Sequence, residues 1–335
     1  MDRLAARADA YDNLPAEDRH RAKVGGIADL RHHLRQRAEE LRHAIGGHIF
    51  GGLFTNEDAE LDLVTTKLAD LVEIEKLVDT NPEGYLLHLD TTGTRTKAVF
   101  AVGDPDTADH IAVITPGLNT TVGAWLGTLI REVTGLRDEA HRALRHAGRT
   151  DTVATIAWLG YEPPCLTGGL DDLVCGGMDA LFDIEARAGA PDLADFYSAL
   201  ARNSTRAVPH LVALGHSYGS LTTSLALQHN PVHPVDDAIF YGSPGLYAAD
   251  ATDLALPPGR AYLAEADRDW VADTGWFGGD PADGDFTALT THAGIGYDGA
   301  PRRTVTGHSE YARAGTVTAH NFAMLIAGLP DLLIR

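Results

Sequence analysis

The stretch from Leu211 to Ser220, LVALGHSYGS, decides the fold of this chain. A short apolar run ends in the pattern Gly-x-Ser-x-Gly, and leucines at helical spacing follow at once. This is the order of a strand, a sharp turn and a helix, in which the turn strains the serine backbone and the glycines let strand and helix pass closely. The stretch therefore predicts Ser217 as a nucleophile beside the positive end of a helix. The alternative is an ordinary serine in a glycine-rich turn.

The segments around this stretch alternate between strand-like apolar runs and helical patterns. The predicted strands are 85–89, 97–102, 111–115, 152–159, 210–214, 237–241, 260–264 and 303–306, and the predicted helices are 121–147, 177–200, 218–229 and 315–328. Strands separated by helices favour right-handed crossovers and parallel pairing, whereas the first two strands are expected to form an antiparallel hairpin at the sheet edge. The predicted fold class is α/β, with a mainly parallel central sheet flanked by helices.

Residues 1–82 differ from the rest of the chain. Apolar residues recur there at helical spacing, and Asn81-Pro82 ends the pattern. We therefore divide the chain into a helical N-terminal segment, 1–82, and a main domain, 83–335. The simplest role for the segment is a layer packed on the main domain. The alternative is an arm for docking or for homo-oligomer formation.

Composition narrows the class of protein. The chain of 335 residues has a formal net charge of −20, which argues against nucleic-acid binding. It has no apolar run long enough for a membrane span, and its charged N-terminus does not resemble a signal peptide, so we expect a cytoplasmic protein. The two cysteines, Cys165 and Cys175, lack zinc-ligand spacing and are expected to be reduced, with one loop-closing disulfide as the alternative in an exported protein.

A nucleophilic serine needs a base, and a third group that orients the base. In chains with this turn, the acid and then the histidine follow the serine. His308 lies in a turn after the last strand-like run and is the predicted base. Two carboxylates, Asp267 and Asp269, follow the strand-like run before it. We prefer Asp269 as the acid, because Asp-x-Val after a short polar turn is typical of this position, and Asp267 is the alternative.

An oxyanion hole is predicted from two backbone N–H groups. One belongs to Tyr218, the residue after the nucleophile, and the other to Leu118, in the loop after an earlier central strand. Asn119, His216 and Tyr161 are expected to contact the substrate. His216 is the variable residue of the turn and faces the wrong way to act as base on its own neighbour.

Three further patterns do not support a cofactor or a metal. Residues 294–299 spell Gly-x-Gly-x-x-Gly but do not join a strand to a helix, as dinucleotide binding requires. Residues 280–285 resemble the start of a calcium loop but lack its closing glutamate. The pair His32-His33 has no metal-ligand spacing. We predict no cofactor and no metal site.

Several motifs taken together resemble a known family. They are GHSYGS at 215–220, WLGY at 158–161, GSPG at 242–245 and GHS-x-Y at 307–311. The chain resembles, over roughly 85–330, an actinobacterial branch of the α/β-hydrolases that is catalogued as a domain of unknown function. The resemblance implies an α/β-hydrolase fold with Ser217 as nucleophile and His308 as base. The insertion-like segment from Cys165 to Cys175 departs from the branch where a substrate wall would lie.

The sequence favours a serine hydrolase that cleaves a small-molecule carboxylic ester, of a lipid or another hydrophobic acyl group, through a Ser-His-Asp triad and an acyl-enzyme. An acyltransferase or an amidase could use the same triad. A non-catalytic binding protein built on a hydrolase scaffold is the alternative from another class.

Overall fold

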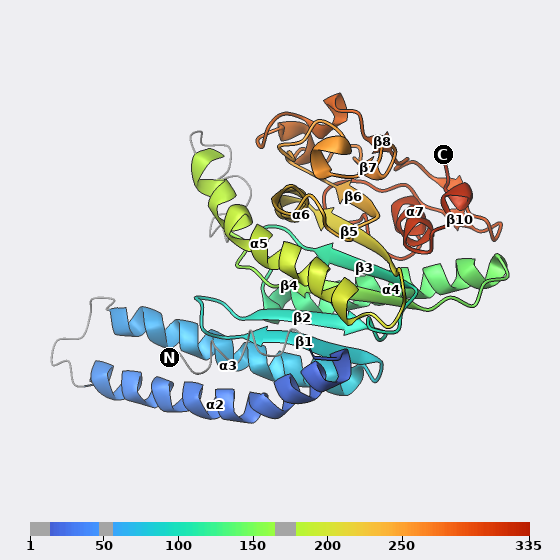
Figure 1. Ribbon diagram of the computed structural model, residues 1–335. Coiled ribbons are helices and arrows are strands. Elements are labelled where there is room, and N and C mark those ends of the chain that lie inside the picture. The colour runs from blue at the N-terminus through green and yellow to red at the C-terminus, as the bar shows by residue number, and fades with distance from the viewer. Residues whose placement is uncertain (1–13, 47–55, 165–178) are drawn as a thin grey trace.

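The computed structural model describes residues 14–46, 56–164 and 179–335 (Figure 1). Cys165 and Cys175 lie outside the described residues, so the predictions on their redox state and on the segment between them stay predictions. None of the helices in the described ranges is both long and apolar enough to cross a membrane.

The centre of the molecule is an eight-stranded sheet in the order β1-β2-β4-β3-β5-β6-β7-β8. The strands are β1 (Gly84–Asp90), β2 (Lys97–Val102), β3 (His110–Thr115), β4 (Val153–Leu159), β5 (His210–His216), β6 (Asp237–Tyr241), β7 (Ala261–Ala264) and β8 (Thr287–Ala288). β2 is antiparallel to β1 and to β4, and every neighbouring pair from β4 to β8 is parallel. The prediction of a mainly parallel sheet with an antiparallel hairpin at its edge is confirmed.

Helices cover both faces of this sheet. The α-helices of the described ranges are α2 (Ala16–Gly46), α3 (Asn56–Thr80), α4 (Gly127–His146), α5 (Asp179–Asn203), α6 (Tyr218–His229) and α7 (Val317–Ile326). α4 and α7 pack together on one face, and α5 and α6 on the other (Figure 1). Strands covered on both faces need apolar side chains along their whole length, and β3, β4 and β6 are accordingly buried at every position.

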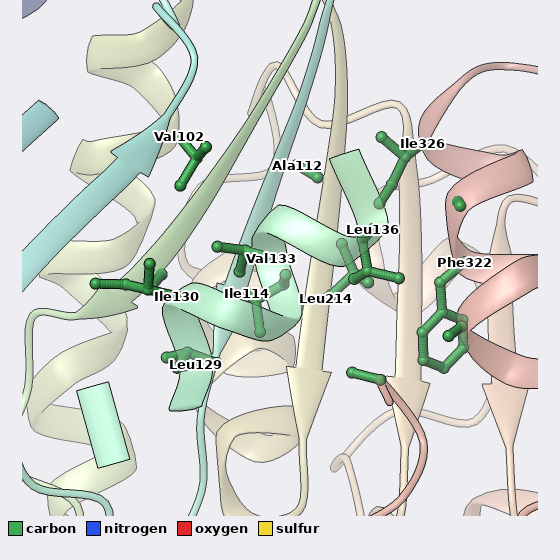
Figure 2. Packing of buried hydrophobic residues seen from close by; sticks show 14 of the residues in the cluster. Val102, Ala112, Ile114, Leu129, Ile130, Val133, Leu136, Leu214, Phe322 and Ile326 are labelled. Atoms are coloured by element: carbon green, nitrogen blue, oxygen red, sulfur yellow. The ribbon is translucent and has the colours of Figure 1, made fainter. Parts of the chain in front are cut away.

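The core on the α4 face shows how the sequence produces the layers (Figure 2). Leu129, Ile130, Val133 and Leu136 recur at three- and four-residue steps, so they form one stripe along α4. Figure 2 shows this stripe against the strand residues Ala112, Ile114 and Leu214, with Phe322 and Ile326 of α7 beside it.

The N-terminal helices α2 and α3 lie together beside β1 (Figure 1). Their contacts to the rest of the chain include polar groups. The backbone N–H of Ala16 donates to Asp106 Oδ2 over 2.6 Å, and the Leu86 N–H of β1 donates to His20 Nδ1 over 3.0 Å. These contacts join the helices to the sheet. The division of the chain at residue 82 and homo-oligomer formation through these helices stay predictions.

One predicted strand is wrong. Residues 303–306 form only isolated bridges, between Arg303 and Thr316 and between Thr306 and Asp267. The last strand of the sheet is instead the two-residue β8, and 294–302 forms a separate hairpin of β9 (Gly294–Ile295) and β10 (Pro301–Arg302). The strand-like pattern of 303–306, β-branched residues around Val305, reflects burial of Val305 in the core rather than strand pairing.

Candidate active site

Ser217 lies in the sharp turn between β5 and α6. Its φ is +53° and its ψ −130°, a left-handed conformation that costs free energy in any residue with a side chain. Two backbone hydrogen bonds hold it there: the Ser217 N–H donates to Tyr241 O over 3.0 Å, and the Ser220 N–H donates to Ser217 O over 2.9 Å. The strained turn predicted from the sequence is therefore present.

Glycines make room for this turn. A Cβ atom at Gly219 would lie 2.2 Å from Thr115 O, and one at Gly215 would lie 2.5 Å from Ser220 Cα. Gly117, in the loop after β3, is equally constrained, because its Cβ would lie 2.7 Å from Ser217 Cβ and 3.0 Å from Tyr218 N. The loop that carries Leu118 therefore lies directly against the serine turn.

His308 joins the serine to a carboxylate. Its Nε2 lies 2.7 Å from Ser217 Oγ, and its Nδ1 lies 2.8 Å from Asp269 Oδ1. A carboxylate can only accept, so the ring hydrogen belongs on Nδ1, and Nε2 is left to accept from the serine hydroxyl. The structure thus brings together the three residues preferred from the sequence. Their catalytic roles stay predictions.

Asp269 is almost completely buried, with 1% of its surface exposed. Burial acts to raise the pKa of its carboxyl, but the hydrogen bonds from His308 and Tyr311 and the charge of His308 outweigh it, and the pKa lies below its usual value. The carboxylate is therefore held ionised beside the imidazole.

Tyr311 is a functional candidate that the sequence argument missed. Its hydroxyl donates to Asp269 Oδ2 over 2.7 Å and accepts the Ala266 N–H over 2.8 Å. Burial, and then the Asp269 charge, raise the pKa of this phenol, so it remains a donor. Its spacing from His308 is visible in the motif GHS-x-Y at 307–311, but that spacing alone does not predict the contact with Asp269.

Asp267, the alternative acid, does not reach His308 with its side chain in this structure. The Asp267 side chain is exposed, and the contacts of this residue are made by its backbone. Its carbonyl accepts the Gly307 N–H over 3.2 Å, and it pairs with Thr306 in an isolated bridge. This pairing joins the segment before Asp269 to the segment before His308.

His216 contacts the backbone of the loop that carries His308, here called the histidine loop. Its Nε2 lies 2.8 Å from His308 O, and its ring stacks on Tyr241 at 4.9 Å between centroids. Burial, and then the charge of His308, lower the pKa of His216 to about 3, so the ring is neutral and Nε2 donates to the carbonyl. The predicted substrate contact of His216 stays a prediction, and the contact observed is structural.

The loop after β3 is fixed at both of its ends. The Tyr161 hydroxyl donates to Pro116 O over 2.6 Å, and the Asn119 N–H donates to Pro164 O over 2.9 Å. Asn119 has a φ of +60°, so the loop also contains a left-handed residue. Tyr161 is 3% exposed and stacks on Trp158, so it lies beneath this loop. Contacts of Asn119 and Tyr161 with a substrate stay predictions.

Tyr218, whose N–H is one of the two predicted oxyanion donors, is fixed in position by contacts of its side chain. The Ala186 N–H of α5 donates to the Tyr218 hydroxyl over 3.0 Å, and the ring stacks on Tyr161. Leu118 is partly buried and packs on the core of the α5–α6 face.

Within the described ranges, no group of three or more His, Cys, Asp or Glu side chains is placed to hold a metal ion.

Residues 91–278, more than half of the chain, match the model of a family described as alpha/beta hydrolase. The chain belongs to the alpha/beta hydrolase family. This match and the parallel sheet confirm the predicted family and fold. A protein of Mycobacterium tuberculosis strain H37Rv, described as uncharacterized, is 38% identical to this hydrolase over 240 residues, which cover 69% of the chain and 86% of the relative. The identical figures hold for a protein of Mycobacterium bovis.

The chain is also similar, at lower identity, to a second relative and to two solved structures. A second uncharacterized Mycobacterium tuberculosis protein is 32% identical over 182 residues, which cover 54% of this hydrolase and 26% of that protein. A solved arylesterase superposes with a TM-score of 0.44 and 11% identity, covering 88% of this chain and 98% of its own. An esterase of the archaeon Pyrobaculum calidifontis gives a TM-score of 0.41 and 11% identity, covering 90% and 97%.

Proposed function

We propose that this alpha/beta hydrolase is a serine esterase that cleaves carboxylic esters with a hydrophobic acyl group. The observation that carries the proposal is the continuous hydrogen-bond chain from Ser217 Oγ through His308 to the buried Asp269, with the serine in a strained turn between strand and helix. A binding protein that only retained the scaffold would gain nothing from a strained serine or from a buried, ionised carboxylate.

The first half of the proposed reaction forms an acyl-enzyme. Ser217 Oγ attacks the ester carbonyl carbon while its proton moves to His308 Nε2. Asp269, hydrogen-bonded to Nδ1, stabilises the imidazolium that results. The carbonyl oxygen becomes an oxyanion, for which we propose the Leu118 and Tyr218 N–H groups as donors. The C–O bond to the alcohol then breaks, and His308 gives its proton to the leaving oxygen.

The second half repeats these steps with water. His308 Nε2 takes a proton from water as the water oxygen attacks the acyl carbon, and Ser217 leaves with that proton restored to Oγ. The products are the carboxylic acid and the alcohol, and no cofactor takes part in the proposed cycle. An alcohol or an amine in place of water would give acyl transfer by the same residues.

The test is hydrolysis of p-nitrophenyl esters from acetyl to palmitoyl by the wild type and by Ser217→Ala. We expect turnover in the wild type only, because the alanine variant lacks the nucleophile but keeps the fold. Labelling by a fluorophosphonate probe should depend on Ser217 in the same way. Absence of both turnover and labelling in a folded wild type would contradict the proposal and favour the binding-protein alternative. Products of transfer to added alcohol, in excess over hydrolysis, would favour the acyltransferase.

A further inference from the structure

The helix that follows the loop of Leu118 begins without a cap of its own. Its first turn is a π-helical turn, η1 (Val122–Leu126), which continues directly into α4. Thr121 occupies the N-cap position, but its side chain makes no capping hydrogen bond. The N–H groups at a helix start need acceptors, which come from water or from side chains elsewhere in the chain when the N-cap residue supplies none.

One such acceptor is a carboxylate of the N-terminal segment. Asp70, on α3, accepts the Gly123 N–H at its Oδ1 over 2.9 Å. Asp70 is 5% exposed, which is uncommon for an aspartate, and burial raises the pKa of its carboxyl. An anion at a helix N-terminus is also stabilised by the helix dipole. Asp70 thus takes the place of an N-cap residue, although about fifty residues of chain separate it from the turn.

A glycine lies where α3 approaches this turn most closely. A Cβ atom at Gly123 would lie 3.0 Å from Asp70 Oδ1, which is closer than most Cβ contacts. Leu71 and Ile74 of α3 share one buried core with Leu126. The start of η1 is therefore fixed to α3 by a hydrogen bond and by apolar packing.

A second route joins α3 to the same loop. The Lys67 ammonium donates to Gly93 O in the turn between β1 and β2. Arg95, in that turn, donates to Pro163 O. The next carbonyl, Pro164 O, accepts the Asn119 N–H. The two routes reach the segment 119–123 from its two ends, and both begin on α3.

We propose that α3 belongs to the catalytic unit, with Asp70 as a positioning residue that sets the loop carrying the Leu118 N–H. This inference rests on the proposed function, because it assigns the helical segment a part in oxyanion stabilisation. Asp70 does not touch the substrate. Its effect passes through Gly123, five residues after Leu118, and should therefore appear in turnover more than in substrate binding.

The test compares Asp70→Ala with Asp70→Asn, and with Asp62→Ala as a control at an exposed carboxylate of the same helix. Loss of a whole oxyanion donor costs about 10²–10³ in kcat, and we expect its misplacement in Asp70→Ala to lower kcat about tenfold with KM nearly unchanged. Asparagine can accept the same hydrogen bond, so Asp70→Asn should keep most of the activity. kcat is counted per serine labelled to completion by fluorophosphonate, which corrects for unfolded protein.

Two further measurements test the positioning role of α3 independently of Asp70→Ala turnover. Lys67→Met breaks the second route while keeping most of the side-chain packing, and should lower kcat by a smaller factor of about three. Backbone hydrogen exchange over 117–126 should be faster in Asp70→Ala than in Asp62→Ala, and this readout does not require turnover. If the wild type hydrolyses no ester but exchange responds in this way, the proposed function fails and the positioning role stands.

Unchanged exchange, or a kcat per labelled serine equal to that of the wild type, would overturn the inference. So would a change confined to KM. If Asp70→Ala does not fold, Asp70→Asn is compared with Asp70→Ser, whose side chain is too short to reach Gly123. Equal loss of kcat in these two variants would also contradict the inference.

Discussion

The two halves of the candidate site are held in place by different means. Around Ser217 the constraint is steric, since Gly117, Gly215 and Gly219 lie where any Cβ atom would collide with backbone or with the serine itself. Around His308 and Asp269 the constraint is mainly a set of side-chain hydrogen bonds, from Tyr311 to the carboxylate and from His216 to the histidine loop. One glycine also makes room there, since a Cβ atom at Gly242 would lie 2.9 Å from Asp269 Oδ2, a side-chain atom rather than backbone.

This difference teaches how each half should respond to substitution. A Cβ atom within 3 Å of a backbone atom forces the backbone to shift, and in a closely packed interior that shift displaces the turn itself. A lost hydrogen bond leaves the packing intact and costs about 1–3 kcal/mol. The serine half should therefore fail outright, whereas the acid–histidine half should lose activity in steps.

The largest effect is expected from Gly219→Ala. Its Cβ would lie 2.2 Å from Thr115 O, so the turn cannot form and no turnover should be measurable. Ester hydrolysis and circular dichroism check this together. Gly25→Ala is the matched control, because nothing lies within 4 Å of a Cβ there, and alanine should stabilise the helix by up to about 1 kcal/mol. A Gly219→Ala variant with near-normal activity would break the comparison.

The next effect separates the two candidate acids. Asp269→Asn should lower kcat by about 10³–10⁴, because the amide can leave the imidazole in the wrong tautomer. Asp267→Asn should stay within about twofold of the wild type, since Asp267 contributes its backbone carbonyl and asparagine keeps that. Steady-state kinetics of the two variants decide. Equal losses would show that side-chain charge near the turn matters more than contact with His308.

Tyr311→Phe should cost less, about tenfold in kcat/KM, the equivalent of one hydrogen bond to a charged group. The pH profile distinguishes positioning from mere packing. Removing the donor raises the pKa of Asp269, so the carboxylate binds the proton that it shares with His308 more strongly, and the low-pH fall of kcat/KM, which reports the coupled Asp269–His308 pair, should move to higher pH. Tyr197→Phe, at an equally buried tyrosine of α5, serves as control. A tenfold loss without movement of the profile would leave Tyr311 as packing alone.

The smallest effect concerns His216 and is one of stability. Its folded pKa of about 3 lies below the unfolded value, so the unfolded chain binds the extra proton and stability falls as pH decreases from neutrality. A histidine with an unfolded pKa of about 6.5 loses about 2 kcal/mol between pH 7 and pH 5. Between pH 7 and pH 5, the free energy of unfolding of His216→Gln should therefore fall by about 2 kcal/mol less than that of the wild type. Urea denaturation of both proteins at pH 7 and at pH 5 measures this. Equal losses would place the His216 ring in solvent.

The sequence predicted the steric half of the site better than the hydrogen-bonded half, for a physical reason. The Ser217 turn is decided by residues within a few positions of each other, so it leaves a local pattern. Asp267 and Asp269 have similar local surroundings, but in the structure the Asp267 backbone pairs with Thr306 and its side chain is exposed, whereas Asp269 is buried against His308 and Tyr311. Such long-range pairing leaves no local pattern. The strand predicted at 303–306 is wrong for a related reason, since the pattern around buried Val305 is local, whereas strand pairing depends on a distant partner.

Asp70 could have been flagged from the sequence. It lies four residues before Ile74 and seven before Leu77, on the apolar face of its helix, where an aspartate needs an explanation. Its partner could not have been predicted, because Gly123 carries no side chain and belongs to another element. Tyr311 is similar, since its spacing from His308 is visible but its contact with Asp269 depends on the path of two loops.

The contact between His20 and Leu86 bears on how this protein would aggregate. β1 is an edge strand, and an exposed edge offers N–H and C=O groups on which another chain can add a strand. The His20 ring occupies one of these N–H groups, and α2 and α3 lie beside the strand, while the opposite edge, β8, is only two residues long. Protonation of His20 would remove its acceptor. We therefore expect intermolecular strand addition in acid to begin at β1, once α2 has detached.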